Sequence, residues 1–465
     1  MKHLSSVLIA VIFTYWFSNA CDFRITKWIW KTDATESERQ PEHNRLSTVY
    51  QELSSNRPQA DTLDRLISPL ESQGHQRLRD LGLRSREYNK HFAVWRKLHL
   101  TSSGNTSCIR DDIHHVIRNG NIDTATNMQL ANTYDEYRFF IAHLSHSLFP
   151  WTWPYFPDHL SLLSHGSSGR GIDFTASDTY ILPLIVAIRN LRRLGCALPI
   201  EVMYFGDEDL STESRELLID LPDVVTRDMS FMIHNTEFNL GGWSLKPFAM
   251  LLASFREVIL MDADAYMFRD PTDLFEEPGY RKTGALFFYD RIMKQKTDKR
   301  AWLQQVLDTP TESIADNRLW NGRSSHMQES GVVVVNRWKH LVALLLSCQL
   351  NGPEYGNEHL QFIWGDKETY WLAKEMLGEP DYAFHEGGVA AMGSVTKDSD
   401  TDNNDERLKI CAKQLIHLDR AHRPLWFNGG LHAFNDNPNQ ETMFGFDVNT
   451  TFITEDDCID TGSGC

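Results

Sequence analysis

The sequence predicts an α/β fold in which a mostly parallel β-sheet is covered by helices on both faces. From Gly169 to Cys348, short apolar segments alternate with segments of helical periodicity, which is the pattern of such a sheet. One apolar segment, Val258–Met261, contains no polar residue, as expected for a strand buried on both faces. The hydrophobic content of 41% allows a sizeable core.

The strands and helices of this domain are expected in alternation. The expected strands span residues 171–177, 200–206, 223–230, 257–262, 285–290 and 331–338. The expected helices span residues 180–194, 211–221 and 245–256, and a further helix begins at residue 340. Gly195 ends the first of these helices, and a serine or threonine caps the second.

The regions outside this domain differ in composition. Residues 24–60 are polar without clear periodicity and are expected to form a stalk. Residues 61–167 place apolar residues three and four apart and predict a helical extension with a structural or partner-binding role. The α/β domain is expected over residues 168–455, with a solvated loop at 398–406 and a short tail at 456–465.

The first 23 residues contain an apolar segment that starts at Leu4 and carries no charge before Asp22. This segment is long enough for a short membrane span, and its flanking charges favour an N-terminus in the cytoplasm. We therefore expect a signal-anchor and a single-pass type II topology. The alternative is secretion after cleavage of a signal peptide, because Ser18–Ala20 is typical of a signal-peptidase site. Either interpretation places the rest of the chain in a secretory compartment.

Other features agree with a secretory compartment. Asn105 and Asn449 each begin a glycosylation acceptor triplet. The seven cysteines show no CxxC or zinc spacing, and some are expected to pair in an oxidising lumen, with Cys458 and Cys465 able to close a small loop. The net charge of −17 disfavours nucleic acid as a partner.

Two aspartates follow the most apolar of the expected strands, in the segment EVILMDADAYMFRDP from Glu257 to Pro271. Successive side chains of a strand point to opposite faces, so Asp262 and Asp264 are expected to point the same way. Ligands bind at the carboxyl ends of strands in open α/β sheets. Two neighbouring carboxylates repel each other unless a cation separates them, and oxygen ligands suit Mg²⁺ or Mn²⁺ together with phosphates. The pair therefore predicts a metal site.

A divalent metal that binds a diphosphate is compatible with group transfer from a nucleotide sugar. A phosphatase or nuclease usually requires a second metal site with more clustered His and Asp residues, and the sequence shows no such cluster. A GxxxxGK[ST] loop is also absent from the sequence, which excludes a P-loop enzyme.

Several short motifs occur in a specific order along the chain. They are GRGIDFTASDTY (169–180), WSLKPFAMLLASF (243–255), GALFFYDR (284–291), QESGVVVVNRW (328–338), GDKETYW (365–371) and AKQLIHLDRAHRPLWFNGGL (412–431). In this order, they resemble glycosyltransferases of the A-type fold in the glycogenin-like retaining branch. More closely, the chain is similar to the fungal Golgi α-1,3-mannosyltransferase family over about residues 168–447.

The resemblance implies roles for residues that bind the nucleotide sugar. Thr175 and Ala176 would contact the nucleotide through their backbone, and Tyr180 would lie against its base. Lys246 would contact the donor, in a position at a helix start that the helix dipole disfavours for a cation. The other residues implied to contact the donor are Asp262, Asp290, Ser330, Gly331, Trp426 and Asn428.

The resemblance also implies catalytic residues and a third metal ligand. Asp366 and Glu329 would lie near the transferred sugar, as groups that stabilise positive charge or as a nucleophile. Asp366 would be equally ordinary as a helix N-cap. His417 would join Asp262 and Asp264 as a metal ligand, and an imidazole ligand favours Mn²⁺ over Mg²⁺.

These implications lead to one predicted function. The chain is expected to transfer mannose from GDP-mannose to a mannose-containing acceptor glycan in the Golgi lumen, with retention and an α-1,3 linkage. Other Golgi glycosyltransferases are possible partners. The alternatives are a UDP-hexose-dependent transferase of the same fold and a non-catalytic lumenal module that binds glycans.

Overall fold

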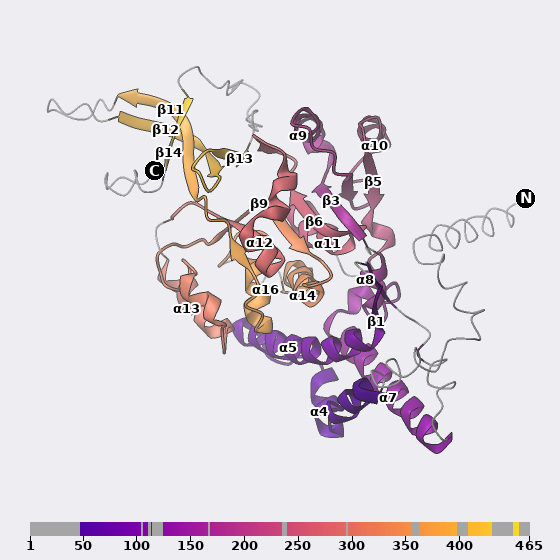
Figure 1. The fold of residues 1–465 in the computed structure, drawn as a ribbon. Coiled ribbons are helices and arrows are strands. Elements are labelled where there is room, and N and C mark those ends of the chain that lie inside the picture. The colour runs from indigo at the N-terminus through magenta and orange to yellow at the C-terminus, as the bar shows by residue number, and fades with distance from the viewer. Residues whose placement is uncertain are drawn as a thin grey trace, which may run out of the picture. The chain divides into compact units, whose positions relative to one another are not determined.

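The computed structural model of the 465-residue chain describes residues 47–103, 106–109, 113, 124–165, 168–234, 240–293, 296–355, 362–397, 408–429 and 450–454 (Figure 1). The chain divides into two compact units. One is formed by Met1–Ala60 with His91–Ile141, and the other by Asp61–Lys90 with Ala142–Cys465.

Several sequence predictions fall outside the described residues. They concern the N-terminal segment 1–23, the glycosylation sites Asn105 and Asn449, and the pair of Cys458 and Cys465. Among the residues that are described, none of the helices is both long and apolar enough to cross a bilayer.

The first unit is mainly helical. Its described elements are a helix over residues 47–55, the later part of α5 (Gly74–His99), the hairpin of β1 (Leu100–Ser103) and β2 (Thr106–Ile109), and the earlier part of α7 (Thr124–Leu148). Aromatic side chains join its two long helices. The rings of Trp95 and Tyr134 lie 5.0 Å apart, and the Tyr134 hydroxyl lies 3.0 Å from Nε2 of His99.

The second unit is built on a seven-stranded sheet with the order β10-β8-β9-β6-β3-β4-β5. Its strands are β3 (Ser168–Thr175), β4 (Ile200–Tyr204), β5 (Val224–Asp228), β6 (Phe255–Met261), β8 (Ala285–Tyr289), β9 (Gln328–Asn336) and β10 (Ala383–Phe384). Of the described strand pairs in this sheet, only the two made by β9 are antiparallel. The prediction of an α/β fold with a mostly parallel sheet flanked by helices is confirmed.

One face of this sheet packs against α9 (Ile181–Arg193). Ile259 and Met261 of β6 belong to the same buried cluster as Leu184 and Ile188 of this helix. These apolar residues are four apart on the helix and two apart on the strand, so each element buries one face.

The opposite face of the sheet is covered by three buried helices (Figure 1). They are α11 (Lys246–Leu252), α14 (Leu341–Asn351) and α16 (Thr369–Leu377), of which α11 contacts β3 and β6 and α14 contacts both other helices. Val258 and Leu260 point to this face because they alternate with Ile259 and Met261. Strand β6 is therefore buried on both faces, as its apolar run indicates.

A second sheet brings late parts of the chain to the end of β6. Its antiparallel strands, in the order β14-β11-β12-β13-β7, are β14 (Thr450–Thr454), β11 (Val389–Lys397), β12 (Leu408–Leu418), β13 (Pro424–Asn428) and β7 (Ala265–Met267). Strand β7 follows β6 after a short turn. Because Asn428 pairs with Ala265 and His417 pairs with Trp426, the motif of residues 412–431 lies close to this turn.

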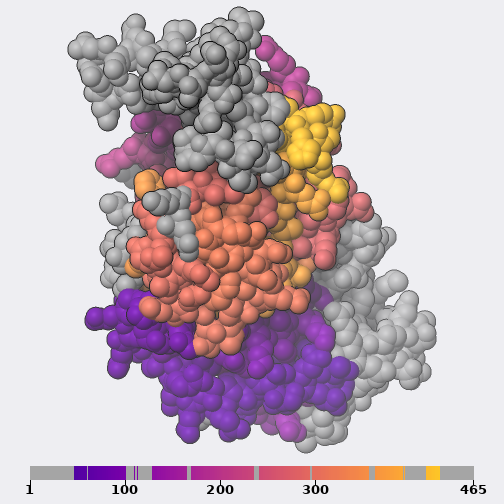
Figure 2. Space-filling model, turned by 90° about the vertical axis from the view of Figure 1, so that its left-hand side faces the viewer, coloured from indigo at the N-terminus to yellow at the C-terminus, as the bar shows by residue number. Residues whose placement is uncertain are grey.

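Shorter helices complete the second unit. They are α4 (Ala60–Ile67), α8 (Leu160–His165), α10 (Thr212–Ile219), α12 (Pro278–Thr283) and α13 (Thr297–Val306). The predicted cap of α10 is present, since the hydroxyl of Ser211 accepts the N–H of Ser214 (3.3 Å). Arg86 of α5 donates to the carbonyls of Met376 and Thr309, both at 3.2 Å. Figure 2 shows the segment that contains α13, in salmon, beside the segment that contains α5, in indigo.

We expect Arg337, which directly follows β9, to be essential for stability. Its buried guanidinium donates to the carbonyls of Leu162 (3.1 Å), Leu251 (3.0 Å) and Phe255 (2.8 Å). Arg337→Met leaves these buried acceptors unpaired and should lower the free energy of unfolding by about 3 kcal/mol or more.

Denaturant unfolding of the full chain measures this loss. The matched control is Arg420→Met, because Arg420 is half exposed and pairs with the exposed Glu386. This control should change the free energy of unfolding by less than about 0.5 kcal/mol. Equal effects of the two substitutions would contradict the role of Arg337.

Candidate active site

The two neighbouring aspartates lie in a turn between β6 and β7. Strand β6 ends at Met261, and the N–H of Ala265 donates to the carbonyl of Asp262 (3.0 Å). The N–H of Asp262 donates to the carbonyl of Gly331 in β9 (2.9 Å). A turn, rather than the strand alternation expected from sequence, therefore sets the directions of the Asp262 and Asp264 carboxylates.

Lys246, the first residue of α11, joins three segments of the site. Pro247 follows it and suits a first helical turn, where a missing N–H costs nothing. The ammonium of Lys246 is buried and lies 2.7 Å from Oδ1 of Asp262 and 3.3 Å from Oδ2 of Asp366. It also donates to the carbonyl and the hydroxyl of Ser330, both at 3.0 Å.

The charges around Lys246 are strongly coupled. Burial alone would lower the pKa of Lys246, but the charges of Asp262 and Asp366 outweigh burial and raise it. Burial raises the pKa of Asp262 to about 6; Asp366 and Asp264 act in the same direction and Lys246 opposes them. Burial also raises the pKa of Asp264. Three carboxylates, those of Asp262, Asp264 and Asp366, thus face the single ammonium of Lys246, and a further cation would stabilise their ionised forms.

Strand β9 places Glu329, Ser330 and Gly331 beside the turn. A Cβ atom at Gly331 would lie 2.9 Å from Nδ2 of Asn428 and 2.9 Å from the ring of Trp426, so this close approach requires glycine. The amide of Asn428 donates to Oε1 of Glu329 (3.0 Å) and lies 3.5 Å from Oδ2 of Asp262. Asn428 therefore connects Glu329, a candidate catalytic residue, with Asp262 in the turn after β6.

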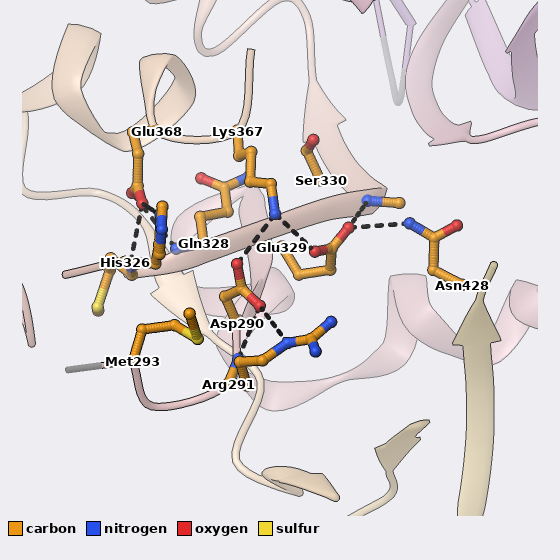
Figure 3. Close-up of polar contacts among 12 residues, drawn as sticks. Asp290, Arg291, Met293, His326, Gln328, Glu329, Ser330, Lys367, Glu368 and Asn428 are labelled. Carbon is orange, nitrogen blue, oxygen red and sulfur yellow. Dashed lines mark hydrogen bonds and ion pairs between the residues drawn. The ribbon is translucent and has the colours of Figure 1, made fainter. Parts of the chain in front are cut away.

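Lys367 lies between two buried carboxylates, as Figure 3 shows. Its Nζ atom is 2.9 Å from Oδ2 of Asp290, which follows β8, and 3.1 Å from Oε2 of Glu329. Burial alone would raise the pKa of Glu329, but Lys367 and Lys246 help to lower it to about 2. Burial raises the pKa of Asp290 despite Lys367. Glu329 is therefore ionised at neutral pH.

Asp366 lies in the turn before α16, with its carboxylate inside the site. The hydroxyl of Tyr370 donates to Oδ2 of Asp366 (3.0 Å), the same atom that faces Lys246. The N-cap of α16 is Glu368, so the sequence alternative of Asp366 as a helix cap does not apply. Burial, followed by the charge of Asp366, raises the pKa of Tyr370 well above its ordinary value. Tyr370 is thus a neutral donor.

His417 of β12 is fully buried against Trp426. Their rings are stacked, with centroids 3.9 Å apart and an angle of 12°. Neither ring nitrogen of His417 has a hydrogen-bond partner within the described part of the chain. Burial lowers the pKa of His417 to about 3, so the imidazole is neutral, the form that binds metals. Trp426 is 0% exposed and offers no open face to a ligand.

Residues 169–419, more than half of the chain, match a protein family described as "Mannosyltransferase putative". The chain belongs to this mannosyltransferase family. The matched region contains the two lysines of the site, the aspartate turn, Glu329, Asp366 and His417. Family membership and the mostly parallel sheet together confirm the predicted A-type glycosyltransferase fold.

Named relatives agree with this family. "Putative alpha-1,3-mannosyltransferase MNN14" of Candida albicans is 30% identical over 317 residues, which cover 59% of this chain and 44% of the relative. "Alpha-1,3-mannosyltransferase MNT2" of Saccharomyces cerevisiae is 27% identical over 300 residues, which cover 57% of this chain and 52% of the relative. The chain thus spans about half the length of the relatives that it matches.

Solved structures of glycosyltransferases show a weaker likeness. The galactosyltransferase LgtC in complex with donor and acceptor sugar analogues has a TM-score of 0.32 and 14% identity, covering 46% of this chain and 73% of LgtC. Core-mannan synthase A from Aspergillus fumigatus in its Mn/GDP form also has a TM-score of 0.32, with 12% identity over 47% of this chain and 72% of the synthase. These scores are too low to carry an argument about chemistry.

The predicted metal ligands of this mannosyltransferase-family site only partly converge. Among the described residues, no three His, Cys, Asp or Glu side chains lie close enough together to hold one ion. The residue types nevertheless fit a divalent cation, because Asp262 and Asp264 supply carboxylate oxygens and neither buried ring nitrogen of His417 has a hydrogen-bond partner among the described residues. A bound ion would have to draw these three side chains together.

The residues predicted to bind the nucleotide lie at the carboxyl end of β3, next to β6 in the sheet. Thr175 ends β3, and the N–H of Ala176 donates to the carbonyl of Met203 (3.1 Å). The N–H of Ala176 is therefore already engaged within the sheet and is not available to a ligand. Tyr180 is 46% exposed, and its ring is accessible for stacking.

Sequence reasoning missed Lys367 and Tyr370 as members of the site. Both lie in the GDKETYW motif, where only Asp366 stands out as a candidate. A usable signal was present, because a lysine between two acids at a turn needs partners when the turn is buried. Tyr370 and its partner Asp366 are only four residues apart, whereas the partners of Lys367, Asp290 and Glu329, follow only from the fold.

We expect Lys367→Met to destabilise the protein because it leaves Glu329 and Asp290 buried without their cation. The free energy of unfolding at pH 7 should fall by about 3–5 kcal/mol. The pKa of Glu329, now about 2, should rise above its unfolded value of 4.5. The native state would then bind more protons than the unfolded state, so the deficit should shrink as the pH falls from 7 to 5.

Denaturant titrations of the full chain at both pH values test this expectation. Adding Glu329→Gln to Lys367→Met should restore part of the lost stability. Lys339→Met is the control, because Lys339 forms a surface pair with Asp381 at 2.9 Å. A pH-independent deficit for Lys367→Met would show that Lys367 does not hold Glu329 ionised.

Proposed function

We propose that this chain transfers mannose from GDP-mannose to a hydroxyl of a mannose-containing acceptor, with retention and an α-1,3 linkage. The observation that carries the proposal is the contact of Lys246 with Asp262, Asp366 and Ser330 at the carboxyl end of β6 in a member of a mannosyltransferase family. The names of the relatives support the transferred sugar and the linkage. The proposed location is the Golgi lumen, behind an N-terminal anchor, with other Golgi glycosyltransferases as possible partners.

Asp262, Asp264 and His417 would hold Mn²⁺, or Mg²⁺ in its place. When bound, the ion would stabilise negative charge on the diphosphate leaving group. Lys246 adds a fixed positive charge on the same side, because its ammonium lies 2.7 Å from Asp262. Its raised pKa keeps it protonated throughout turnover.

Glu329 and Asp366 would face the anomeric carbon as the bond from that carbon to the diphosphate oxygen breaks. Positive charge then develops on the sugar, and the ionised Glu329 stabilises it. Both oxygens of Glu329 are engaged, one by Lys367 and the other by Asn428. A carboxylate held in this way favours charge stabilisation over nucleophilic attack.

Retention would then result from attack by the acceptor hydroxyl on the face that the diphosphate leaves. The acceptor oxygen bonds to the anomeric carbon, and its proton passes to the departing diphosphate oxygen. This route needs no covalent intermediate between sugar and protein.

Parallel assays of the purified full-length chain test the proposal. GDP-mannose, UDP-galactose and UDP-glucose are each offered with Mn²⁺ and α-mannobiose, and nucleotide release and product mass are measured. We expect an added mannose from GDP-mannose alone. Asp264→Ala should reduce this transfer by about 100-fold or more, because Asp264 is a proposed metal ligand.

The surface aspartate Asp207 provides the matched control, since its side chain is 83% exposed and pairs with Arg215. Asp207→Ala should leave the transfer rate within about twofold of the wild type. Turnover with only a UDP-sugar would contradict the proposed donor. Binding of α-mannobiose without transfer from any donor would favour a glycan-binding module.

A further inference from the structure

Two tryptophans beside the active site have exposed indole rings. Trp243 lies in the short helix η4 (Gly242–Leu245) directly before α11, and 42% of its surface is exposed. Trp364 lies two residues before Asp366, and 66% of its surface is exposed. By contrast, Trp426, which the family resemblance implies as a donor contact, is fully buried. The aromatic surface next to the site therefore comes from residues outside the predicted set.

Gly365 brings the ring of Trp243 against the backbone next to Trp364. This glycine has a φ of +58°, and a Cβ atom on it would lie 3.3 Å from Cδ2 of Trp243. The ring of Trp243 thus packs over the backbone of the residue that separates Trp364 from Asp366. A positive φ and this close approach both favour glycine, so the packing of Trp243 at this position depends on Gly365.

Trp364 is also connected to the start of β9. Its ring lies 6.4 Å from the ring of His326. Nδ1 of His326 is 3.7 Å from Oε1 of Glu368, which accepts the N–H of Met327 (2.9 Å). The indoles therefore belong to the β9 and α16 side of the site, which carries Glu329.

This side of the site is suited to a neutral ligand with apolar faces. Its carboxylates Asp290, Glu329 and Asp366 can accept hydrogen bonds from hydroxyl groups. A pyranose ring presents C–H groups that pack on an aromatic face, with hydroxyls at its edge. The residues expected to bind the nucleotide follow β3, which lies on the other side of β6 from β9.

We infer that Trp243 and Trp364 bind the acceptor mannoside, with one or both indoles stacked on its sugar rings next to Asp366. This inference rests on the proposed mannosyl transfer, because it names the residues that receive the acceptor of that reaction. It assigns the two tryptophans a role in acceptor affinity and none in donor binding.

Steady-state kinetics of the full-length chain with GDP-mannose, Mn²⁺ and varied α-mannobiose test this assignment. Trp364→Leu and Trp243→Leu keep an apolar side chain but remove the flat face, and each should raise the acceptor KM about three- to tenfold. Trp364→Tyr keeps a flat face and should retain most of the affinity. The donor KM and the hydrolysis of GDP-mannose without acceptor should stay within about twofold.

Phe231→Leu is the matched control, because Phe231 is 75% exposed and follows β5 at the far edge of the sheet. It should leave both KM values unchanged. An unchanged acceptor KM in both tryptophan-to-leucine variants would overturn the inference. A raised donor KM in place of a raised acceptor KM would also overturn it and would assign the indoles to the nucleotide base.

Calorimetric titration of α-mannobiose into the donor-free chain separates this inference from the proposed function. The wild type should bind the disaccharide, and Trp364→Leu should bind it about three- to tenfold more weakly. Absence of transfer by the wild type would refute the proposed function alone. Equal binding by the wild type and Trp364→Leu, or no binding by either, would refute the acceptor site.

Discussion

The buried ammonium of Lys246 is the interaction on which the rest of the site depends. It holds Asp262 of the turn after β6, Ser330 of β9 and Asp366 of the turn before α16 within hydrogen-bonding distance of one atom. These segments are far apart in the chain, and two of them carry negative charge. Without a cation between them, the carboxylates would repel each other in a largely buried site.

A second lysine, Lys367, holds two further carboxylates together on the sugar side of the site. Lys367 balances Glu329 and Asp290, but the two lysines together still face more carboxylates than they can neutralise. The remaining negative charge suits a metal ion beside the diphosphate and positive charge on the sugar in the transition state. Structural stability and the proposed chemistry therefore rest on the same charges.

The sequence predicts the strands and helices that carry this site but only some of the residues that line it. The apolar run before Asp262 is predictable because burial on both faces demands it, and Lys246 stands out as a cation at a helix start. The burial of Trp426 is not predictable, because it depends on the pairing of β13 with β12 and β7. The partners of Lys367 are likewise set by tertiary contacts between segments 38 and 77 residues apart.

The central claim, that Lys246 binds the acidic segments together, is tested most directly by a double-mutant cycle on Lys246 and Asp366. Denaturant unfolding would be measured for the wild type, Lys246→Met, Asp366→Asn and the double variant. We expect Lys246→Met to lower the free energy of unfolding by less in the Asp366→Asn background than in the wild type, with a coupling energy of about 1–3 kcal/mol. Costs that add within about 0.3 kcal/mol would contradict it.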